Sequence, residues 1–193
     1  QVTPDVLVPR ADTETLVDWA LALPLPHAGV SVLDLGTGSG AIALALKHQR
    51  PDWEVHAVDA SPAALQVAQQ NAERLGLSIQ LHLSDWFSQI DGVFDLIVSN
   101  PPYIPRTDKA TLQHEVRDHE PELALYGGDD GLEIYRRLIP EAARVLKPGG
   151  WAGVRTPDWG GFLYSPQTPA FMGNLRLLEA MTVTRAWQNR RRA

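Results

Sequence analysis

The sequence predicts an α/β fold, a doubly wound and mostly parallel sheet of the Rossmann-like type with helices on both faces. Short apolar runs rich in β-branched residues alternate with segments of helical periodicity, an order that favours right-handed βαβ units. A glycine-rich turn follows the first run, and an acidic residue ends the second. Sheets of this kind bind ligands at the carboxyl ends of their strands, so we expect the functional residues there.

Apolar runs mark the strands, and helical spacing marks the helices. Strands are expected at residues 30–35, 54–58, 79–83 and 94–98, with a fifth strand from Trp151 after a turn at 147–150. Helices are expected at residues 14–23, 41–48, 61–75 and 131–146. Asp12 and Thr13 offer an N-cap to the first helix, whereas Ser61 and Gly76 are expected at the two ends of the third.

We expect a single domain of three parts. Residues 1–28 supply an N-terminal segment and helix, residues 29–151 the core, and residues 152–193 a C-terminal part without a clear strand pattern. The polar segment 104–128 is long for a connection, which predicts a functional loop with a short helix. Because the first residue is Gln1, we expect a fragment or a processed piece of a longer protein.

The composition excludes several classes of protein. The chain has no cysteine, which rules out disulfides and thiolate metal sites and favours the cytoplasm. Its 6 histidines show no ligand spacing, so no metal is expected. A net charge of −6 argues against stable binding to nucleic acid, and no apolar run is long enough to span a membrane. The chain is expected to act as a monomer.

The strongest single signal is the glycine-rich turn between the strand that ends at Leu35 and the next helix. Glycines let a backbone turn tightly and approach a ligand closely. Asp59 ends the following strand about 20 residues later, where a carboxylate accepts hydrogen bonds from a ribose diol. We therefore expect the turn and both acidic residues to bind a cofactor: Asp34, Gly36, Thr37, Gly38, Ser39, Gly40 and Asp59.

The spacing of the glycines distinguishes two kinds of cofactor. The turn reads Gly-x-Gly-x-Gly, not the Gly-x-Gly-x-x-Gly of dinucleotide-binding folds, and Asp34 leads into it. S-Adenosyl-L-methionine carries an ammonium and a sulfonium group but no phosphate. An acidic residue that leads into the turn therefore favours S-adenosyl-L-methionine over a nicotinamide cofactor as the ligand. Ser39 lies inside this turn without the Gly-x-Ser-x-Gly elbow of serine hydrolases, which excludes that chemistry.

Asp85 and Trp86 follow the third strand, which in this fold lies beside the adenine of a bound nucleoside. A carboxylate or backbone group there can bind the exocyclic amine, and an aromatic ring can cover the base. The alternative for Trp86 is a partly buried packing residue. We expect both residues to contact the cofactor.

A rigid polar loop, Asn100-Pro101-Pro102-Tyr103, follows the fourth strand. The prolines have no N–H to donate, and Asn100 precedes a proline, so the loop is stiff and extended. The Asn100 oxygen and the Pro101 carbonyl can accept both N–H groups of a planar nitrogen and direct its lone pair at a sulfonium methyl, while Tyr103 stacks on the substrate. We expect Asn100, Pro101 and Tyr103 to be catalytic, all four residues to bind substrate, and Asn100 also to contact the cofactor.

Taken together, these motifs resemble those of the release factor glutamine methyltransferases, the HemK/PrmC family. Residues 8–14 are similar to the family's Pro-Arg-Pro-[Asp/Glu]-Thr-Glu segment, with Ala11 in place of the second proline. The remaining similarity lies in residues 32–43, Ser84 to Phe87, Ser99 to Ile104, Glu120-Pro121 and residues 127–131. The family has an N-terminal helical domain, which is missing here. It also has a closing β-hairpin, which we do not find after Trp151, where Ala180 to Trp187 would supply one strand at best.

The resemblance implies S-adenosyl-L-methionine-dependent methylation of a side-chain amide nitrogen, that of the glutamine in the Gly-Gly-Gln motif of peptide chain release factors. S-Adenosyl-L-homocysteine would be the product. It also implies cofactor contacts by Gly36, Gly38, Gly40, Asp59, Trp86 and Asn100. Three alternatives stay open: methylation of a ribosomal protein glutamine, methylation of adenine or cytosine amines in nucleic acid, and a cofactor-binding module without activity.

Overall fold

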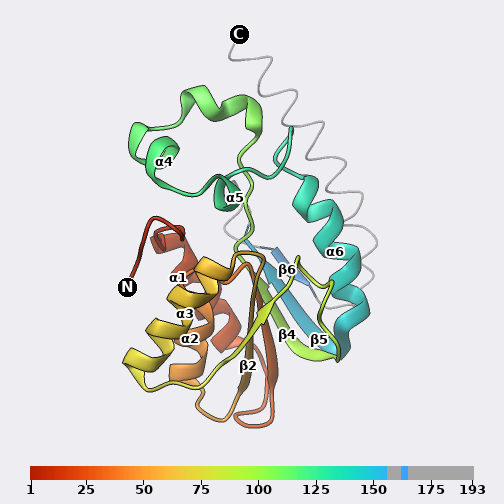
Figure 1. The fold of residues 1–193 in the computed structure, drawn as a ribbon. Helices are drawn as coiled ribbons and strands as arrows, with labels where there is room; N and C mark the ends of the chain where they lie inside the picture. The colour runs from red at the N-terminus through yellow and green to blue at the C-terminus, as the bar shows by residue number, and fades with distance from the viewer. Residues whose placement is uncertain (156–161, 165–193) are drawn as a thin grey trace.

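The computed structural model describes residues 1–155 and 162–164 of the 193-residue chain. Its centre is a 6-stranded sheet with strand order β3-β2-β1-β4-β5-β6 (Figure 1). The strands are β1 Ser31–Leu35, β2 Glu54–Asp59, β3 Gln80–Leu83, β4 Phe94–Ser99, β5 Leu146–Val154 and β6 Phe162–Tyr164. Strands β1 to β5 pair in parallel and β6 runs antiparallel to β5, which confirms the predicted mostly parallel sheet.

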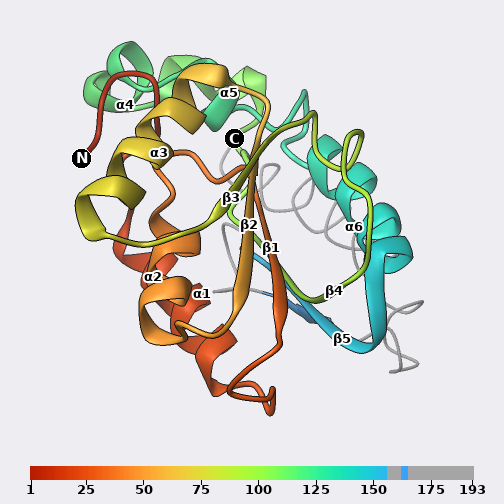
Figure 2. The ribbon, with the colours of Figure 1, turned by 60° about the horizontal axis from the view of Figure 1, so that its bottom comes forward.

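Helices cover both faces of this sheet (Figures 1 and 2). Helices α1 Ala11–Ala22, α2 Ala41–Gln49 and α3 Pro62–Leu75 lie on one face, and α6 Glu133–Val145 lies on the other. Successive side chains of a strand point to opposite faces, so Val32 packs with residues of α1 and α2, whereas Leu33 packs with residues of α6. Burial on both faces explains why successive residues at the centres of β1 and β4, Val32-Leu33 and Leu96 to Val98, are apolar.

The structure shows which residues cap helices α1 and α3, for which the sequence predicted caps. Ser61 caps α3, because its Oγ accepts the N–H of Ala64 at 3.2 Å, and Gly76 ends the helix in the left-handed conformation, so both predictions are confirmed. The predicted cap of α1 is wrong, since its N-cap is Arg10, without a side-chain hydrogen bond. Thr13 lies inside the first turn and its N–H donates to the Arg10 carbonyl at 2.9 Å. The helix begins before its apolar pattern does.

The edge of the sheet beyond β4 differs from the prediction. β5 begins at Leu146 instead of Trp151, and its pairing with β4 shifts register before Leu96. The extra residues fall in the predicted turn 147–150, and regular pairing resumes at Trp151. β6 was not predicted, because a three-residue strand has no alternation to read and the open edge of β5 decides its pairing. The strand considered at Ala180 to Trp187 lies outside the described residues.

Segment 104–128, here called the arm, stands above the carboxyl ends of the strands (Figure 1). It contains η1 Arg106–Thr111, α4 His114–His119 and α5 Glu122–Leu125. A parallel bridge between Ile104 and Tyr126 closes its base, and Arg10 at the start of α1 forms an ion pair with Glu120 at 2.6 Å. The arm is therefore closed at its base and tied to the start of α1. None of the helices in residues 1–155 and 162–164 is long and apolar enough to cross a membrane.

Candidate active site

The glycine-rich turn forms one wall of the site at the carboxyl end of β1. The N–H groups of Gly36 and Thr37 both donate to the Val58 carbonyl at 2.9 Å, which joins the turn to β2. Gly40 precedes α2 with φ of 79°, and a Cβ there would lie 3.2 Å from the Ala68 side chain of α3. The left-handed turn and the tight space beside α3 both favour glycine at this position.

Asp34 lies beneath the turn and is not part of the cavity wall. It is fully buried, and its Oδ2 accepts hydrogen bonds from Thr37 Oγ1 at 2.7 Å and from the Ala43 N–H at 3.2 Å. Burial raises the pKa of Asp34 to about 7, although both hydrogen bonds oppose the shift. Its Oδ1 has no hydrogen-bond partner among the described residues. Asp34 thus holds the turn to α2 from behind, where the sequence suggested a direct contact with the cofactor.

Asp59 ends β2 and faces the cavity. Its Oδ2 accepts the N–H of Gly38 and its Oδ1 the N–H of Ser61, both at 2.9 Å. These two hydrogen bonds fix the carboxylate between the glycine turn and the start of α3. Each oxygen still has acceptor capacity for a ligand, so the position suits the predicted ribose-binding role.

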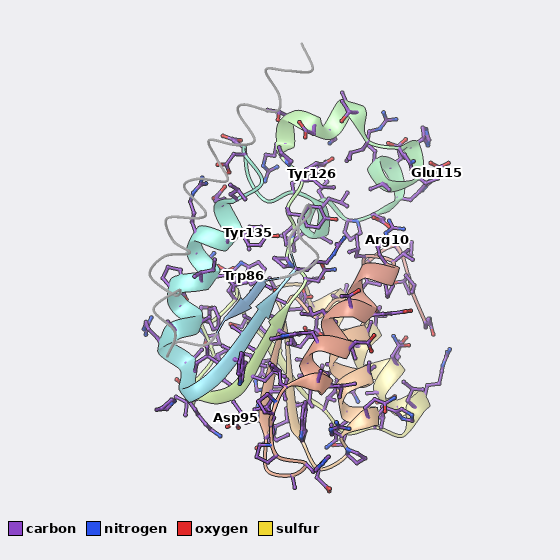
Figure 3. The ribbon with its side chains drawn as sticks, turned by 180° about the vertical axis from the view of Figure 1, so that it is seen from behind. Arg10, Trp86, Asp95, Glu115, Tyr126 and Tyr135 are labelled. Carbon is purple, nitrogen blue, oxygen red and sulfur yellow. The ribbon has the colours of Figure 1, made fainter. Side chains whose placement is uncertain are left out.

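A cavity of about 340 Å³ connects the glycine turn with the Asn-Pro-Pro-Tyr loop. This volume lies in the range of small-molecule sites. On the side of the turn, its lining includes Gly36, Thr37, Gly38, Ser39, Asp59, Asp85, Trp86, Asn100 and Pro102. The start of α1 and parts of the arm line the other side. Figure 3 shows Trp86 and Tyr126 toward this end of the sheet and Asp95 at the opposite end.

Trp86 and Asp85 both line the cavity after β3. Trp86 has φ of 52°, an uncommon left-handed conformation for a bulky residue. Its ring lies against the glycine turn, 3.8 Å from where a Cβ of Gly36 would be, and it also packs partly against the core. The Asp85 carboxylate is paired with Arg137 of α6, with Arg137 Nη2 at 2.6 Å from Oδ2. An amine arriving here would therefore share that carboxylate with a cation.

The Asn-Pro-Pro-Tyr loop leaves β4 at the same edge of the sheet. Asn100 and Pro102 are part of the cavity wall, whereas Pro101 is buried and Tyr103 packs partly against the core. At the end of β4, Ser99 Oγ donates to the Leu35 carbonyl at 2.8 Å, which ties the loop to the end of β1. The structure therefore brings Asn100 beside the glycine turn, while Tyr103 supports the loop from behind.

Two glycines, Gly127 at the end of the arm and Gly131 just after it, lie close to this loop. A Cβ at Gly127 would be 2.6 Å from the Pro102 carbonyl oxygen, and a Cβ at Gly131 would overlap the Tyr103 carbonyl oxygen. Gly131 also has φ of 75°, which disfavours any other residue. The loop keeps its place because these positions have no side chain.

Three residues of the site were not predicted. Thr13 of α1 and Tyr126 of the arm line the cavity with more than nine-tenths of each residue buried, and neither hydroxyl has a partner among the described residues. Arg155 follows β5, and its Nη1 donates to Tyr103 Oη at 3.0 Å and to Asn100 Oδ1 at 3.3 Å. The sequence assigned Thr13 to a helix cap, and no local pattern marks Arg155.

A glycine turn after β1, an acidic residue at the end of β2 and a polar proline loop after β4 surround one cavity. Together with the strand order, they define the fold of the S-adenosylmethionine-dependent methyltransferases. The chain belongs to the methyltransferase small domain family, whose model matches residues 14–122. This range contains every residue that the sequence assigned to the cofactor or to the substrate.

Two curated relatives are similar in sequence to most of this chain. The chain is 53% identical over 151 residues to a release factor glutamine methyltransferase of Geobacter sulfurreducens, a match covering 78% of this chain and 52% of the relative. For the protein of the same name in Gloeobacter violaceus, the identity is 54% over 153 residues, covering 78% and 54%. The chain spans about half the length of the curated relatives it matches.

A solved structure is similar in fold. It is the 16S rRNA N2 G1207 methyltransferase of T. thermophilus in complex with AdoMet and guanosine, with a TM-score of 0.57 and 26% identity. The match covers 78% of this chain and 36% of that chain.

Proposed function

We propose that this chain is the catalytic part of an enzyme that transfers a methyl group from S-adenosyl-L-methionine to a glutamine side-chain amide. The target would be the glutamine in the Gly-Gly-Gln motif of peptide chain release factors. The proposal is carried by the position of Asn100, in the wall of the same cavity as the glycine turn and Asp59. The names of the relatives that are about half identical support glutamine as the target.

The residues around the cavity fit this cofactor. Asp59 offers acceptors for the ribose hydroxyls, and Trp86 lies where an aromatic ring can cover adenine. At the opposite wall, α1 begins without a side-chain cap, and the unpaired Thr13 hydroxyl lies in its first turn. A hydroxyl donor at the positive end of a helix dipole suits a carboxylate. We assign this end of the cavity to the methionine carboxylate.

When bound, the cofactor would supply an electrophilic methyl group on its sulfonium. The residues of the chain would bind and orient the attacking nitrogen, which is a weak nucleophile because its lone pair is delocalised into the amide. Asn100 Oδ1 accepts one of its N–H groups and a backbone carbonyl of the loop accepts the other, so that the lone pair faces the methyl group. The proton can leave after transfer, and positioning supplies most of the rate.

Pro102 and Tyr103 have different roles in this proposal. Pro102 is part of the cavity wall and offers an apolar surface to the flat amide. Tyr103 lies behind the loop, between Gly131 and Arg155, and supports its shape. Its stacking on the substrate stays a prediction beside this supporting role.

The substrate is tested by offering labelled cofactor in parallel to a release factor, a ribosomal protein fraction, ribosomal RNA and DNA. A release factor with Ala in place of the Gly-Gly-Gln glutamine is the control for the target residue. We expect label in the intact release factor alone. Label in the protein fraction or in a nucleic acid, with none in the release factor, would overturn the assignment.

Asn100→Ala tests the mechanism in the same assay. We expect turnover to fall by roughly 100-fold or more, while cofactor affinity falls far less, because the substrate amide loses its acceptor. Gln69→Ala, which removes an exposed amide of α3, is the matched control and should keep full activity. Near-normal turnover of Asn100→Ala would contradict the mechanism.

A nucleic acid base is the second candidate substrate, because its exocyclic amine is also a planar nitrogen. The similar rRNA methyltransferase structure favours this candidate. The net charge of −6 counts against it, since binding to phosphates depends on positive charge. The two nucleic acid samples of the parallel assay decide between the candidates.

We also propose that the chain acts as a monomer in the cytoplasm, where release factors work. The described residues of one copy supply both the cofactor side and the substrate side of the cavity. Sedimentation equilibrium checks this, with a single species at the mass of one chain as the expected result.

A further inference from the structure

Arg155 lies behind the Asn-Pro-Pro-Tyr loop, and hydrogen bonds fix its backbone on both sides. Its N–H donates to the Ser99 carbonyl at 2.9 Å, which extends the pairing of β5 with β4 by one residue. Its carbonyl accepts the hydroxyl of Tyr135, a buried residue of α6, at 2.7 Å. Arg155 itself is only 8% exposed. The sheet and α6 together fix the point from which its side chain reaches the loop.

The guanidinium of Arg155 contacts both side chains that flank the prolines. Nη1 donates to Tyr103 Oη at 3.0 Å and to Asn100 Oδ1 at 3.3 Å, and Cζ lies 5.1 Å from the centre of the Tyr103 ring. A guanidinium has donors and no acceptor. The amide atom of Asn100 that faces it is therefore the oxygen, because the amide nitrogen would bring donor against donor.

We propose that Arg155 is a positioning residue for methyl transfer, which fixes the orientation of the Asn100 amide and the place of the Tyr103 ring. This inference rests on the proposed function and deepens it. An amide oxygen has two lone pairs, so it can accept from Arg155 and from the substrate N–H at once. Without Arg155 the amide can rotate by half a turn and present its NH₂ group to the substrate nitrogen, which needs an acceptor.

The first test measures turnover and binding of Arg155→Ala. We expect kcat for the release factor to fall roughly 10- to 100-fold, as for a misplaced catalytic group, while KM and cofactor affinity change by less than about threefold. Added methylguanidine, which fits the vacated space, should restore part of the lost kcat in Arg155→Ala and none in Asn100→Ala. A kcat equal to that of the wild type, or a loss that methylguanidine leaves unchanged, would overturn the proposal.

Arg50→Ala is the matched control. Arg50 also stands over an aromatic ring, with Cζ 5.8 Å from the centre of the Trp53 ring, but neither residue lines the cavity. We expect its kcat to equal that of the wild type, with no response to methylguanidine.

A second measurement does not depend on methyl transfer. Urea midpoints are compared for Arg155→Ala, Tyr103→Phe and the double variant, and we expect the double variant to shift by less than the sum of the single shifts. Additive shifts would refute the contact and the proposal with it, whatever the substrate is. Coupled shifts in a chain that methylates no release factor would instead refute the proposed substrate and support the contact.

Arg155→Lys keeps the charge and most of the stem but lacks the planar fork. It replaces the alanine variant if that variant does not fold, and the same fall in kcat and the same coupling to Tyr103→Phe are expected. Full activity of Arg155→Lys together with additive urea shifts would overturn the proposal.

Discussion

The Asp59 carboxylate combines a structural and a binding role at the scale of one residue. Its two oxygens hold the N–H groups of Gly38 and Ser61, one from the glycine turn and one from the start of α3. The same carboxylate faces the cavity, so a ligand would meet an acceptor that is already oriented. Preorganisation of this kind lowers the ordering cost of binding.

Asp59→Ala is therefore expected to weaken cofactor binding by about 1.5–3 kcal/mol, the scale of hydrogen bonds to a charged group, or roughly 10- to 150-fold in affinity. Calorimetric titration with S-adenosyl-L-methionine measures the change. Asp52→Ala removes an exposed carboxylate just before β2 and should bind like the wild type. An Asp59→Ala affinity equal to that of Asp52→Ala would contradict the ribose role.

Among the elements of the fold, the Asn-Pro-Pro-Tyr loop depends most on its neighbours. β4 delivers it to the correct edge, but its backbone has room there only beside Gly127, at the end of the arm, and Gly131, just after it. A Cβ at Gly127 would lie 2.6 Å from the Pro102 carbonyl oxygen, and a Cβ at Gly131 would overlap the Tyr103 carbonyl oxygen. Any side chain there would displace the loop, and a displacement of about 1 Å is enough to cost a large factor in rate.

Gly131→Ala is expected to lower turnover more than cofactor affinity, and to lower the free energy of unfolding by about 1–3 kcal/mol through backbone strain and the clash with Tyr103. Gly29→Ala is the matched control, because Gly29 has φ of 73° and a Cβ there would meet nothing within 4 Å. Gly29→Ala introduces the backbone strain of a positive φ but no clash with a neighbour. Equal turnover in the two variants would show that the close approach of residue 131 to the loop does not affect methyl transfer.

The arm is a second element whose position depends on a distant partner. Arg10 of the N-terminal segment pairs with Glu120, whose side chain is only 7% exposed. This contact brings the start of α1 and the arm together over the cavity, as Figure 3 shows from the position of Arg10 beneath the arm. The start of α1 and the arm, which both line the cavity, are thus joined by this ion pair.

For the whole molecule, the burial of Asp34 links stability to pH. Its pKa is raised from 3.8 to about 7 by desolvation, so between these values the folded chain keeps a proton that the unfolded chain releases. The unfolded state then binds fewer protons, and the free energy of unfolding falls as pH rises from about 4 to about 7. Above about 7 this contribution is constant.

Asp34→Asn cannot titrate and should remove this slope. We expect the difference in unfolding free energy between wild type and variant to move in favour of the variant as pH rises from 5 to 7, by up to about 1.4 kcal/mol per pH unit. Urea unfolding at several pH values measures it. A difference that stays constant with pH would mean that Asp34 is ionised throughout.

Local chemistry was enough to predict much of the site and the parallel core. The glycine turn, Asp59 and the Asn-Pro-Pro-Tyr loop can each be recognised from the local sequence. Apolar runs of strand length must pair with one another to satisfy their N–H and C=O groups. These features place Asn100 and Asp59 at the same edge of one sheet, and in the structure both line one cavity.

Tertiary structure alone decided the rest. Whether Asp34 lies in the cavity wall or behind it depends on how α2 packs over the turn, and Thr13 lines the cavity because α1 packs beside the glycine turn and the arm. β6 pairs where β5 leaves an open edge. Arg155 reaches Asn100 across many residues of sequence through the pairing of β5 with β4. These contacts join segments that are far apart in the sequence, and neither segment has a local pattern that identifies its partner. They are therefore determined only by the packing of the whole molecule.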